Sequence, residues 1–283
     1  MIEYRSLEEV PLVEFVNLVN EIFSDYALPV NWDVLNFRLD ARENSLSFEE
    51  SYVFYENERP VGFVVTGMRK SRGRIDAMGV VREKRGTGLA QMILNHALER
   101  LKWHGVERVI LEVAENDPRA VKFYQKNGFH ETRKLYTLAM RVEEEQEPNL
   151  RFFRTDPRWV HRSAIEAEYL IPRKPNWQRE PLTLLLSNGR YNMERVSLKK
   201  DEGYVVWGTT KDSAFIVDAS PIRDSSFYID LVDSSIKHIR KESGKRLVTM
   251  AAVPEDDPLY EAAVSVGFKS VFVQKEMCFR LPA

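Results

Sequence analysis

The feature that most constrains the fold is a short apolar run that breaks into a basic turn with two glycines. The run covers residues 75–81, and the turn reads Arg85-Gly86-Thr87-Gly88-Leu89-Ala90. An amphipathic segment then continues to about His104, so the pattern predicts a strand, a glycine turn and the start of a helix. Backbone N–H groups at a helix start have no partners within the helix, and the helix dipole adds partial positive charge there. The turn is therefore suited to hold a phosphate chain, because its glycines place no Cβ in the way and Arg85 adds a cation at its mouth.

Two commoner glycine loops do not fit this turn. A dinucleotide-binding fingerprint would require Gly or Ala at position 91, where the chain has Gln91. A long phosphate-binding loop would require Gly-Lys-Ser/Thr after four intervening residues, and the turn does not contain it. The structural alternative that remains is an ordinary glycine turn between a strand and a helix.

The composition indicates a globular protein and excludes several classes of function. The 283 residues suggest one large domain or two of ordinary size, and 43% hydrophobic residues are enough for a core. A formal net charge of −2 gives no basic field for nucleic acid, and the basic stretch at residues 69–74 reads as a solvated turn. The single cysteine, Cys278, excludes a disulfide framework and a cysteine-based zinc site within one chain. We expect no metal and no membrane partner, and the N-terminus shows no signal-peptide pattern, so a cytoplasmic protein is predicted.

Residues 1–142 predict an α/β fold, with a mixed sheet flanked by helices. Apolar residues at helical spacing predict a helix over residues 11–23 and a second over 31–39, with Asn31 as its cap. The remaining predicted elements are a hairpin at 51–67, the strand at 75–81, a helix to 104, a strand at 109–113, a helix at 118–127 and two final strands within 129–140.

The glycine turn also matches a family pattern. It fits the arrangement Arg/Gln-x-x-Gly-x-Gly/Ala, with Arg85, Gly88 and Ala90 at the fixed positions and Val80 at the end of the preceding strand. This resembles the loop with which acetyltransferases of the GNAT superfamily bind the pyrophosphate of acyl-CoA. The resemblance implies that acetyl-CoA is the co-substrate. It also implies that the cofactor contacts the loop residues Arg85, Gly86, Thr87, Gly88, Leu89 and Ala90.

A second segment resembles the same family. Residues 117–129 are similar to the family's Asn-x-x-Ala-x-x-x-Tyr-x-x-x-Gly-Phe, with Tyr124, Gly128 and Phe129 in place. The predicted order of elements in residues 1–142 matches the family as well. Two segments at the right separation support each other, because structural context is what confirms a short motif.

The resemblance assigns contacts around the thioester. In the family a backbone N–H at the end of the glycine-loop strand, here about Val80, binds the carbonyl oxygen as charge develops on it. Main-chain groups of Met78 and Val80 would pair with the pantetheine amides. At the family's pantetheine-binding Asn this chain has Asp117, and the neighbouring Asn116 could substitute only if the loop shifts. Tyr124 would donate a proton to the departing thiolate, because its hydroxyl is protonated at neutral pH.

The base that takes the proton of the amine is left open among three candidates. A lysine-type amine has a pKa of ~10.4 and must be neutral to attack. Glu112 and Asp76 are the carboxylates beside the expected site, although strand alternation with Leu111 could turn Glu112 to solvent. Ordered water leading to a carboxylate is the third option. Because Cys278 lies outside this domain, a covalent acetyl-cysteine is not expected, and we predict direct attack in a ternary complex.

The second half of the chain resembles a copy of the first that lacks some of its motifs. An acidic linker is predicted at residues 143–150, and the order of elements repeats in 151–283. We therefore predict a tandem duplication. The closest parallel is between Glu115-Asn116-Asp117-Pro118 with Gly128-Phe129 and Glu255-Asp256-Asp257-Pro258 with Gly267-Phe268.

The residues that would bind CoA and donate a proton are missing from the predicted copy. It has no Arg-Gly-x-Gly turn, and matching the two Gly-Phe pairs places Ala263 opposite Tyr124. We expect a degenerate GNAT-like domain that does not bind CoA in the family manner. Its expected roles are to cover the sheet edge of the first domain, to shape the acceptor site or to mediate a homodimer.

The sequence thus favours an N-acetyltransferase that moves an acetyl group from acetyl-CoA to a primary amine of a small molecule or a peptide. The alternative is a non-catalytic acyl-CoA-binding regulatory or assembly module, since the loop would serve both functions, but Tyr124 favours the enzyme. The first two helices and the loop Ser24-Asp25-Tyr26 are expected to contact the acceptor. Trp32, Phe23 and Tyr26 could line its site, with core packing as the alternative for each.

Overall fold

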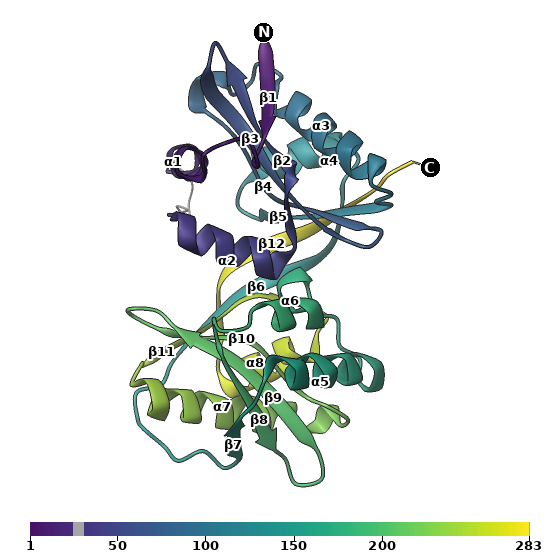
Figure 1. Cartoon of the computed structure of the whole chain (residues 1–283). Coiled ribbons are helices and arrows are strands. Elements are labelled where there is room, and N and C mark those ends of the chain that lie inside the picture. The colour runs from purple at the N-terminus through teal and green to yellow at the C-terminus, as the bar shows by residue number, and fades with distance from the viewer. Residues whose placement is uncertain (25–30, 283) are drawn as a thin grey trace. The chain divides into compact units, whose positions relative to one another are not determined.

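The computed structural model describes residues 1–24 and 31–282, and the chain divides into two compact units (Figure 1). The units are interleaved in the sequence, so neither is one continuous segment. The boundaries differ from the ranges 1–142 and 151–283 expected above. The first unit comprises Met1–Glu112, Phe123–Glu131 and Met277–Ala283, and the second comprises Val113–Lys122 and Thr132–Glu276.

Both halves of the chain contain the same succession of elements, which confirms the predicted duplication and the α/β fold class. The first half contains β1 (Ile2–Ser6), α1 (Leu12–Phe23), α2 (Val34–Asn44), β2 (Leu46–Glu56), β3 (Arg59–Arg69), β4 (Arg72–Val80), α3 (Leu89–Trp103), β5 (Arg108–Ala114), α4 (Pro118–Lys126) and β6 (His130–Arg141). The second half contains β7 (Arg151–Arg154), α5 (Pro157–Leu170), α6 (Pro181–Leu186), β8 (Asn192–Ser197), β9 (Glu202–Thr209), β10 (Ala214–Pro221), α7 (Tyr228–Ser243), β11 (Leu247–Pro254), α8 (Pro258–Val266) and β12 (Lys269–Arg280). Short 3₁₀ turns, η1 (Arg82–Lys84), η2 (Trp177–Arg179) and η3 (Ser225–Phe227), complete the order.

The last strand of the first half lies mostly in the second unit, whereas the last strand of the chain is divided between the units, with residues 277–280 in the first. In the first unit the order is β1-β2-β3-β4-β5, and the strand beside β5 is β12, from the end of the chain. In the second unit the order is β7-β8-β9-β10-β11, and the strand beside β11 is β6, from the first half. The backbone N–H of Leu281, just beyond β12, also donates to the carbonyl of Glu107 at 2.9 Å. Each sheet is therefore completed by a strand that the sequence places at the end of the other half.

Two predictions for the first half need correction. Residues 130–141 form the single strand β6 instead of two final strands. The second helix begins at Val34 instead of Asn31, because the side chain of Asp33 caps it by accepting the backbone N–H of Asn36 at 2.8 Å. Asp25 and Tyr26 of the expected acceptor loop lie outside the described residues.

The helices of the first unit cover both faces of its sheet (Figure 1). A Cβ on Gly62 of β3 would meet the side chain of Ile93 in α3, whereas a Cβ on Gly79 of β4 would meet that of Ile22 in α1. Gly62 pairs with Val80 across the ladder, and side chains alternate between the faces of a strand. Thus α1 and α3 pack on opposite faces, and α3 approaches β3 and α1 approaches β4 so closely that glycines are needed there.

Candidate functional site

The centre of the site is a fork where two parallel strands part. β4 pairs with β5 only as far as Ile75 and Leu111, although both strands continue. The pairing of β4 with β3 shifts in register at the same place, so Asp76 forms a β-bulge. A bulge bends its strand and increases the local twist. We call the stretch of β4 from Asp76 to Val80, with Glu112 of β5 across from it, the first fork.

The register of β3 and β4 directs the main-chain groups of two residues of β4 toward this fork. The backbone N–H of Val81 donates to the carbonyl of Val61 at 3.0 Å, and Val80 and Met78 lie opposite Gly62 and Val64. In an antiparallel ladder the residues that bond to the neighbour alternate with residues whose main-chain groups point the other way. The N–H and C=O groups of Met78 and Val80 therefore point away from β3, toward the side on which β5 has diverged. These are the two residues that the sequence singled out.

The glycine loop follows the fork directly. Gly86 and Gly88 have φ angles of 81° and 90°, and a Cβ on either would meet no atom within 4 Å. Within the described chain, the backbone N–H groups of residues 86–90 donate no hydrogen bond to the protein. Gly88 is the N-cap of α3, so the positive end of the helix dipole adds to these donors. The loop thus fits an anionic group that accepts hydrogen bonds from the main chain.

Arg85 is not a free cation at the mouth of the loop. Its Nε lies 3.4 Å from the carbonyl oxygen of Val80, and its Nη2 lies 3.3 Å from that of Ile22 at the end of α1. The guanidinium therefore links the loop to α1. Its contact with the cofactor stays a prediction, and the loop main chain supplies further donors for an anion.

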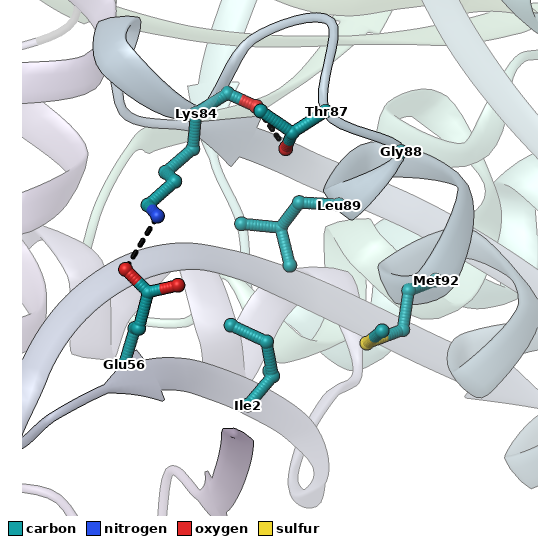
Figure 2. Close-up of a pocket in the computed structure, with 7 residues that line it drawn as sticks. All are labelled: Ile2, Glu56, Lys84, Thr87, Gly88, Leu89 and Met92. Carbon is teal, nitrogen blue, oxygen red and sulfur yellow. Dashed lines mark hydrogen bonds and ion pairs between the residues drawn. The ribbon is translucent and has the colours of Figure 1, made fainter.

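A pocket of about 290 Å³ adjoins the outer side of the loop (Figure 2). Ile2, Leu89 and Met92 make its apolar lining, and Lys84 and Glu56 form an ion pair at its edge. None of Asp76, Glu112 and Tyr124 lines it. The pocket and the fork are therefore separate features, and we place no reacting group in the pocket.

Three charged side chains meet at the fork. Arg74 Nε lies 3.2 Å from a carboxylate oxygen of Asp76, and its Nη2 lies 3.6 Å from one of Glu112. The side chain of Glu112 is only 8% exposed, so it does not face solvent. Burial raises the pKa of Asp76, and the carboxylate of Asp40 on α2 adds to the rise, while Arg74 opposes it. Both predicted base candidates thus lie together, and Asp76 is shifted toward the range in which a carboxylate can act as a base at neutral pH.

The sequence did not indicate the part that Arg74 plays here. Residues 69–74 read as a solvated basic turn, yet Arg69 and Arg74 are only 6% and 5% exposed. Only Lys70 and Ser71 form the turn between β3 and β4. The signal that could have found Arg74 is its spacing of two from Asp76, which would put both on one face of a strand.

Tyr124 lies on α4 in an aromatic group. Its ring makes edge contacts with Phe123 and Phe129, with centroids 5.2 and 5.7 Å apart. The next residues hold the end of α4 to α3, because Gln91 Nε2 donates to Asn127 Oδ1 at 2.5 Å. The short helix is thus fixed at its C-terminal end, where Tyr124 stands.

The neighbouring Asp117 has a structural use. Its carboxylate accepts the backbone N–H groups of Arg119 and Ala120 at 3.1 and 3.0 Å, which caps α4. This accounts for Asp117 without a ligand. Binding of the pantetheine arm by Asn116 stays a prediction.

Phe23 and Trp32 are part of the core packing under α1 and α2. Phe23 contacts Phe63, with ring centroids 5.9 Å apart, and Trp32 contacts Phe37 at 5.1 Å. Trp32 also contacts Phe15 at 6.3 Å. Both residues thus pack on core rings, but neither is fully buried, and their part in lining the acceptor site stays a prediction.

The second unit contains a fork of the same design. β10 and β11 pair as parallel strands only at Ala214–Val248 and Phe215–Thr249, and a register shift makes Val217 the bulge. Here the fork is filled by protein. The buried guanidinium of Arg179 donates to the carbonyls of Val217 on β10 and Ala251 on β11, the latter at 2.6 Å.

The turn after β10 is also occupied. The backbone N–H groups of Arg223 and Asp224 both donate to the carboxylate of Asp201, at 2.9 and 3.1 Å. The N–H of Ile222 donates to Glu202 at the same place in the ladder as Val81 in the first unit. Pro221 therefore stands where the first unit has Val80, and a proline has no N–H to donate.

The match between Ala263 and Tyr124 holds in the backbone. The N–H of Phe268 donates to Ala263 at 3.0 Å, as that of Phe129 donates to Tyr124 at 3.1 Å. Ala263 is fully buried in α8. The second unit therefore has no hydroxyl at this position.

Residues 1–24 and 31–282 contain no group of three or more His, Cys, Asp or Glu side chains that could hold a metal ion. No helix among these residues combines the length and the apolar character needed to cross a membrane.

Comparison with known proteins supports the resemblance. Residues 13–129 match the Acetyltransferase (GNAT) family. N-alpha-acetyltransferase 30 of Schizosaccharomyces pombe is 30% identical over 93 residues, which are 31% of this chain and 62% of that protein, so the chain matches less than two thirds of this relative.

Solved structures extend the likeness to the whole chain. A tandem GNAT protein from the clavulanic acid biosynthesis pathway is 14% identical, with all of both chains covered and a TM-score of 0.70. A GCN5-related N-acetyltransferase from Sphaerobacter thermophilus is 11% identical over 99% of this chain and 95% of its own, also with a TM-score of 0.70. At these identities the likeness concerns the fold. Residues 13–129 therefore match the GNAT acetyltransferase family, and the whole chain has the fold of a tandem GNAT protein.

Proposed function

We propose that the first unit transfers the acetyl group of acetyl-CoA to a primary amine by direct attack in a ternary complex. The observation that carries the proposal is the course of β4. This strand turns the main chain of Met78 and Val80 into the first fork and leads directly into a glycine loop with unused N–H groups. Peptide-like amides can pair with the strand while a pyrophosphate lies on the helix start, and CoA contains both groups.

The residues at the fork have separate roles in this reaction. The N–H of Val80 stabilises negative charge on the carbonyl oxygen as the amine attacks. Asp76 takes the proton of the amine, with Arg74 holding its carboxylate and Asp40 helping to keep its pKa raised. The hydroxyl of Tyr124 then gives a proton to the departing thiolate.

Glu112 is the second candidate for the base. Arg74 lies 3.2 Å from Asp76 and 3.6 Å from Glu112, so one guanidinium orders both carboxylates. We favour Asp76 because burial raises its pKa and it forms the bulge at the fork itself.

The acceptor is a small molecule or a peptide that carries a primary amine. The fission yeast relative is named an N-alpha-acetyltransferase, which makes the α-amine of a peptide the first acceptor to test. An α-amine has a pKa of ~7.7–8.0, against ~10.4 for a lysine side chain. A larger fraction of α-amines is already neutral near pH 7, so an α-amine needs less help from a weak base. A peptide N-terminus therefore suits a site whose base is an aspartate.

We further propose that each chain binds one acetyl-CoA. Arg179 occupies the second fork, Asp201 occupies the N–H groups of its turn, and Pro221 offers no N–H. Titration calorimetry with acetyl-CoA should therefore give one site per chain. Two sites per chain would contradict this proposal.

The test of the enzyme proposal is thiol release from acetyl-CoA with a panel of amines and N-terminal peptides. Tyr124→Phe should lower kcat by ~10²–10⁴-fold, the range for loss of a general acid, and should leave acetyl-CoA binding in place. Tyr169→Phe is the matched control, because Tyr169 is an 88% exposed helical tyrosine of the second unit. Binding of acetyl-CoA without turnover of any acceptor would instead favour the non-catalytic acyl-CoA-binding module.

A further inference from the structure

The last residues of the chain lie against the segment that carries Tyr124. Phe279, in the part of β12 that belongs to the first unit, packs on Phe129 with ring centroids 5.3 Å apart. Phe129 is 3% exposed and in turn contacts Tyr124 at 5.7 Å. The three rings form a continuous line from the C-terminal strand to the proposed proton donor.

The fit between Phe279 and this segment is close. A Cβ on Gly128 would lie 2.9 Å from an edge atom of the Phe279 ring, nearer than real contacts allow. Gly128 also has a φ of 84°, so the turn after α4 needs glycine for its backbone as well. The ring of Phe279 thus packs directly against Gly128, in the turn between Tyr124 and Phe129.

Helix α4 is short and partly exposed along its whole length. It has nine residues, none of which is buried. The bond from Gln91 to Asn127 ties its end to α3, and the backbone N–H of Phe129 returns to the carbonyl of Tyr124 at 3.1 Å. Phe279 therefore packs on a ring that contacts Tyr124 directly, and a change in its packing reaches Tyr124 through Phe129.

We propose that Phe279 is a positioning residue for Tyr124, so that the C-terminal strand of the degenerate half supports catalysis in the first unit. The inference rests on the proposed function. Phe279 acts by fixing Phe129, which fixes the ring of Tyr124 at the angle from which its hydroxyl serves the thiolate. The exchange of strands thereby couples the activity of the first unit to the end of the chain.

The experiment is a double-mutant cycle on the full chain. Phe279→Leu keeps an apolar side chain and removes the ring, and it should lower kcat by up to ~10²-fold, the effect of a catalytic group misplaced by about 1 Å. The KM for acetyl-CoA should stay within about twofold, because uniform binding is not altered. In the double variant with Tyr124→Phe, kcat should be no lower than with Tyr124→Phe alone, since the two residues act as one unit. Phe279→Tyr, which keeps the ring, should restore kcat.

A merely structural role would give a different result. The two substitutions would then lower kcat by independent factors that multiply, and this would overturn the proposal. A folded Phe279→Leu variant with unchanged kcat would overturn it too, provided that Tyr124→Phe is slow. Phe153→Leu is the matched control, because Phe153 is a half-exposed ring on β7 of the second unit, and kcat should not change.

The failure of the proposed function would look different. In that case Tyr124→Phe would retain full kcat, or the wild-type chain would acetylate no amine. Should Phe279→Leu fail to fold by circular dichroism, the same cycle with Phe279→Met, which has a similar volume, replaces it. Additive effects in that cycle would again refute the positioning role.

Discussion

Replacing Asp218 by Asn should destabilise the second unit strongly, because it removes one charge from an ion cluster closed to solvent. The carboxylate of Asp218 is fully buried and accepts two hydrogen bonds from Arg173, at 2.9 and 2.8 Å. It also accepts the hydroxyl of Tyr204 at 2.7 Å. Burial alone would raise the pKa of Asp218, but the guanidinium of Arg173 outweighs it and holds the pKa below the ordinary value.

The magnitude follows from what the substitution leaves behind. Arg173 and Arg179 are 1% and 2% exposed at their side chains. Without Asp218 the nearest remaining anion for Arg173 is Asp257, whose carboxylate lies 3.4 Å from its Nε. Breaking a buried ion pair from one side costs ~3–5 kcal/mol. At ~2–4 °C per kcal/mol for a domain of this size, the Tm should fall by about 6–20 °C.

The assay is chemical and thermal unfolding at neutral pH, followed by circular dichroism. Glu202→Gln is the control, because its pair with Arg195 is 33% and 48% exposed and should contribute no more than ~1 kcal/mol. Adding Arg173→Met to Asp218→Asn should recover part of the loss, since the uncompensated cation is then removed. A loss below ~1 kcal/mol for Asp218→Asn would refute the view that this cluster is dry and coupled.

Three further outcomes follow from the first unit. Gly88→Ala should raise the Kd for acetyl-CoA by up to ~10-fold, because alanine at a φ of 90° costs ~1–2 kcal/mol, while Gly189→Ala, at a φ of 78° in the second unit, should leave that Kd unchanged. If Asp76 is the base, kcat should rise with pH through its pKa, at a pH above the usual range for aspartate, and Asp76→Asn should abolish this limb of the pH profile. Arg100 holds the pKa of buried Glu50 below its ordinary value against the effect of burial, so the pair stabilises the fold above the unfolded-state pKa of ~4.3 and loses this as the pH falls further. Acid unfolding of Glu50→Gln should then begin from a lower Tm and change less between pH 5 and 3.

The loop and the order of elements could be predicted because their signals are local. Positions 86 and 88 of the turn have positive φ, which glycine adopts readily. The apolar spacing of the next fifteen residues predicts α3 directly. The start of α2 was harder, since Asn31 and Asp33 are both good caps. The structure selects Asp33, three residues before the N–H of Asn36 that it accepts.

The exchange of the last strands could not be predicted, because pairing between distant strands leaves no local mark. Residues 130–141 and 269–280 both have the composition of a strand, and neither shows which sheet it will join. The single strand at 130–141 was within reach, however. It contains no Gly, Pro, Asn or Asp that would turn the chain between two strands.

The cluster of charged side chains at the first fork depends on the β-bulge at Asp76, which the sequence pattern does not predict. With the register shifted at Asp76, Arg74 and Asp76 approach each other on one face and Glu112 reaches the same guanidinium. Without that shift, simple alternation leaves Glu112 either inward or solvent-facing. The catalytic candidates could therefore be named from the sequence, but their grouping around one arginine could not.

The main-chain groups at the two forks need hydrogen-bond partners, and the two units supply them in different ways. Where parallel strands part, main-chain groups lose their ladder partners, and a buried polar group without a partner costs ~1–3 kcal/mol. In the first unit Arg85 reaches the carbonyl of Val80, and the N–H groups of Met78 and Val80 face away from β3, which suits a ligand that accepts hydrogen bonds. The second satisfies its carbonyls with Arg179 and the N–H groups of its turn with Asp201. Restoring a glycine turn alone should therefore not create a second CoA site, because Arg179 and Pro221 would still close the fork.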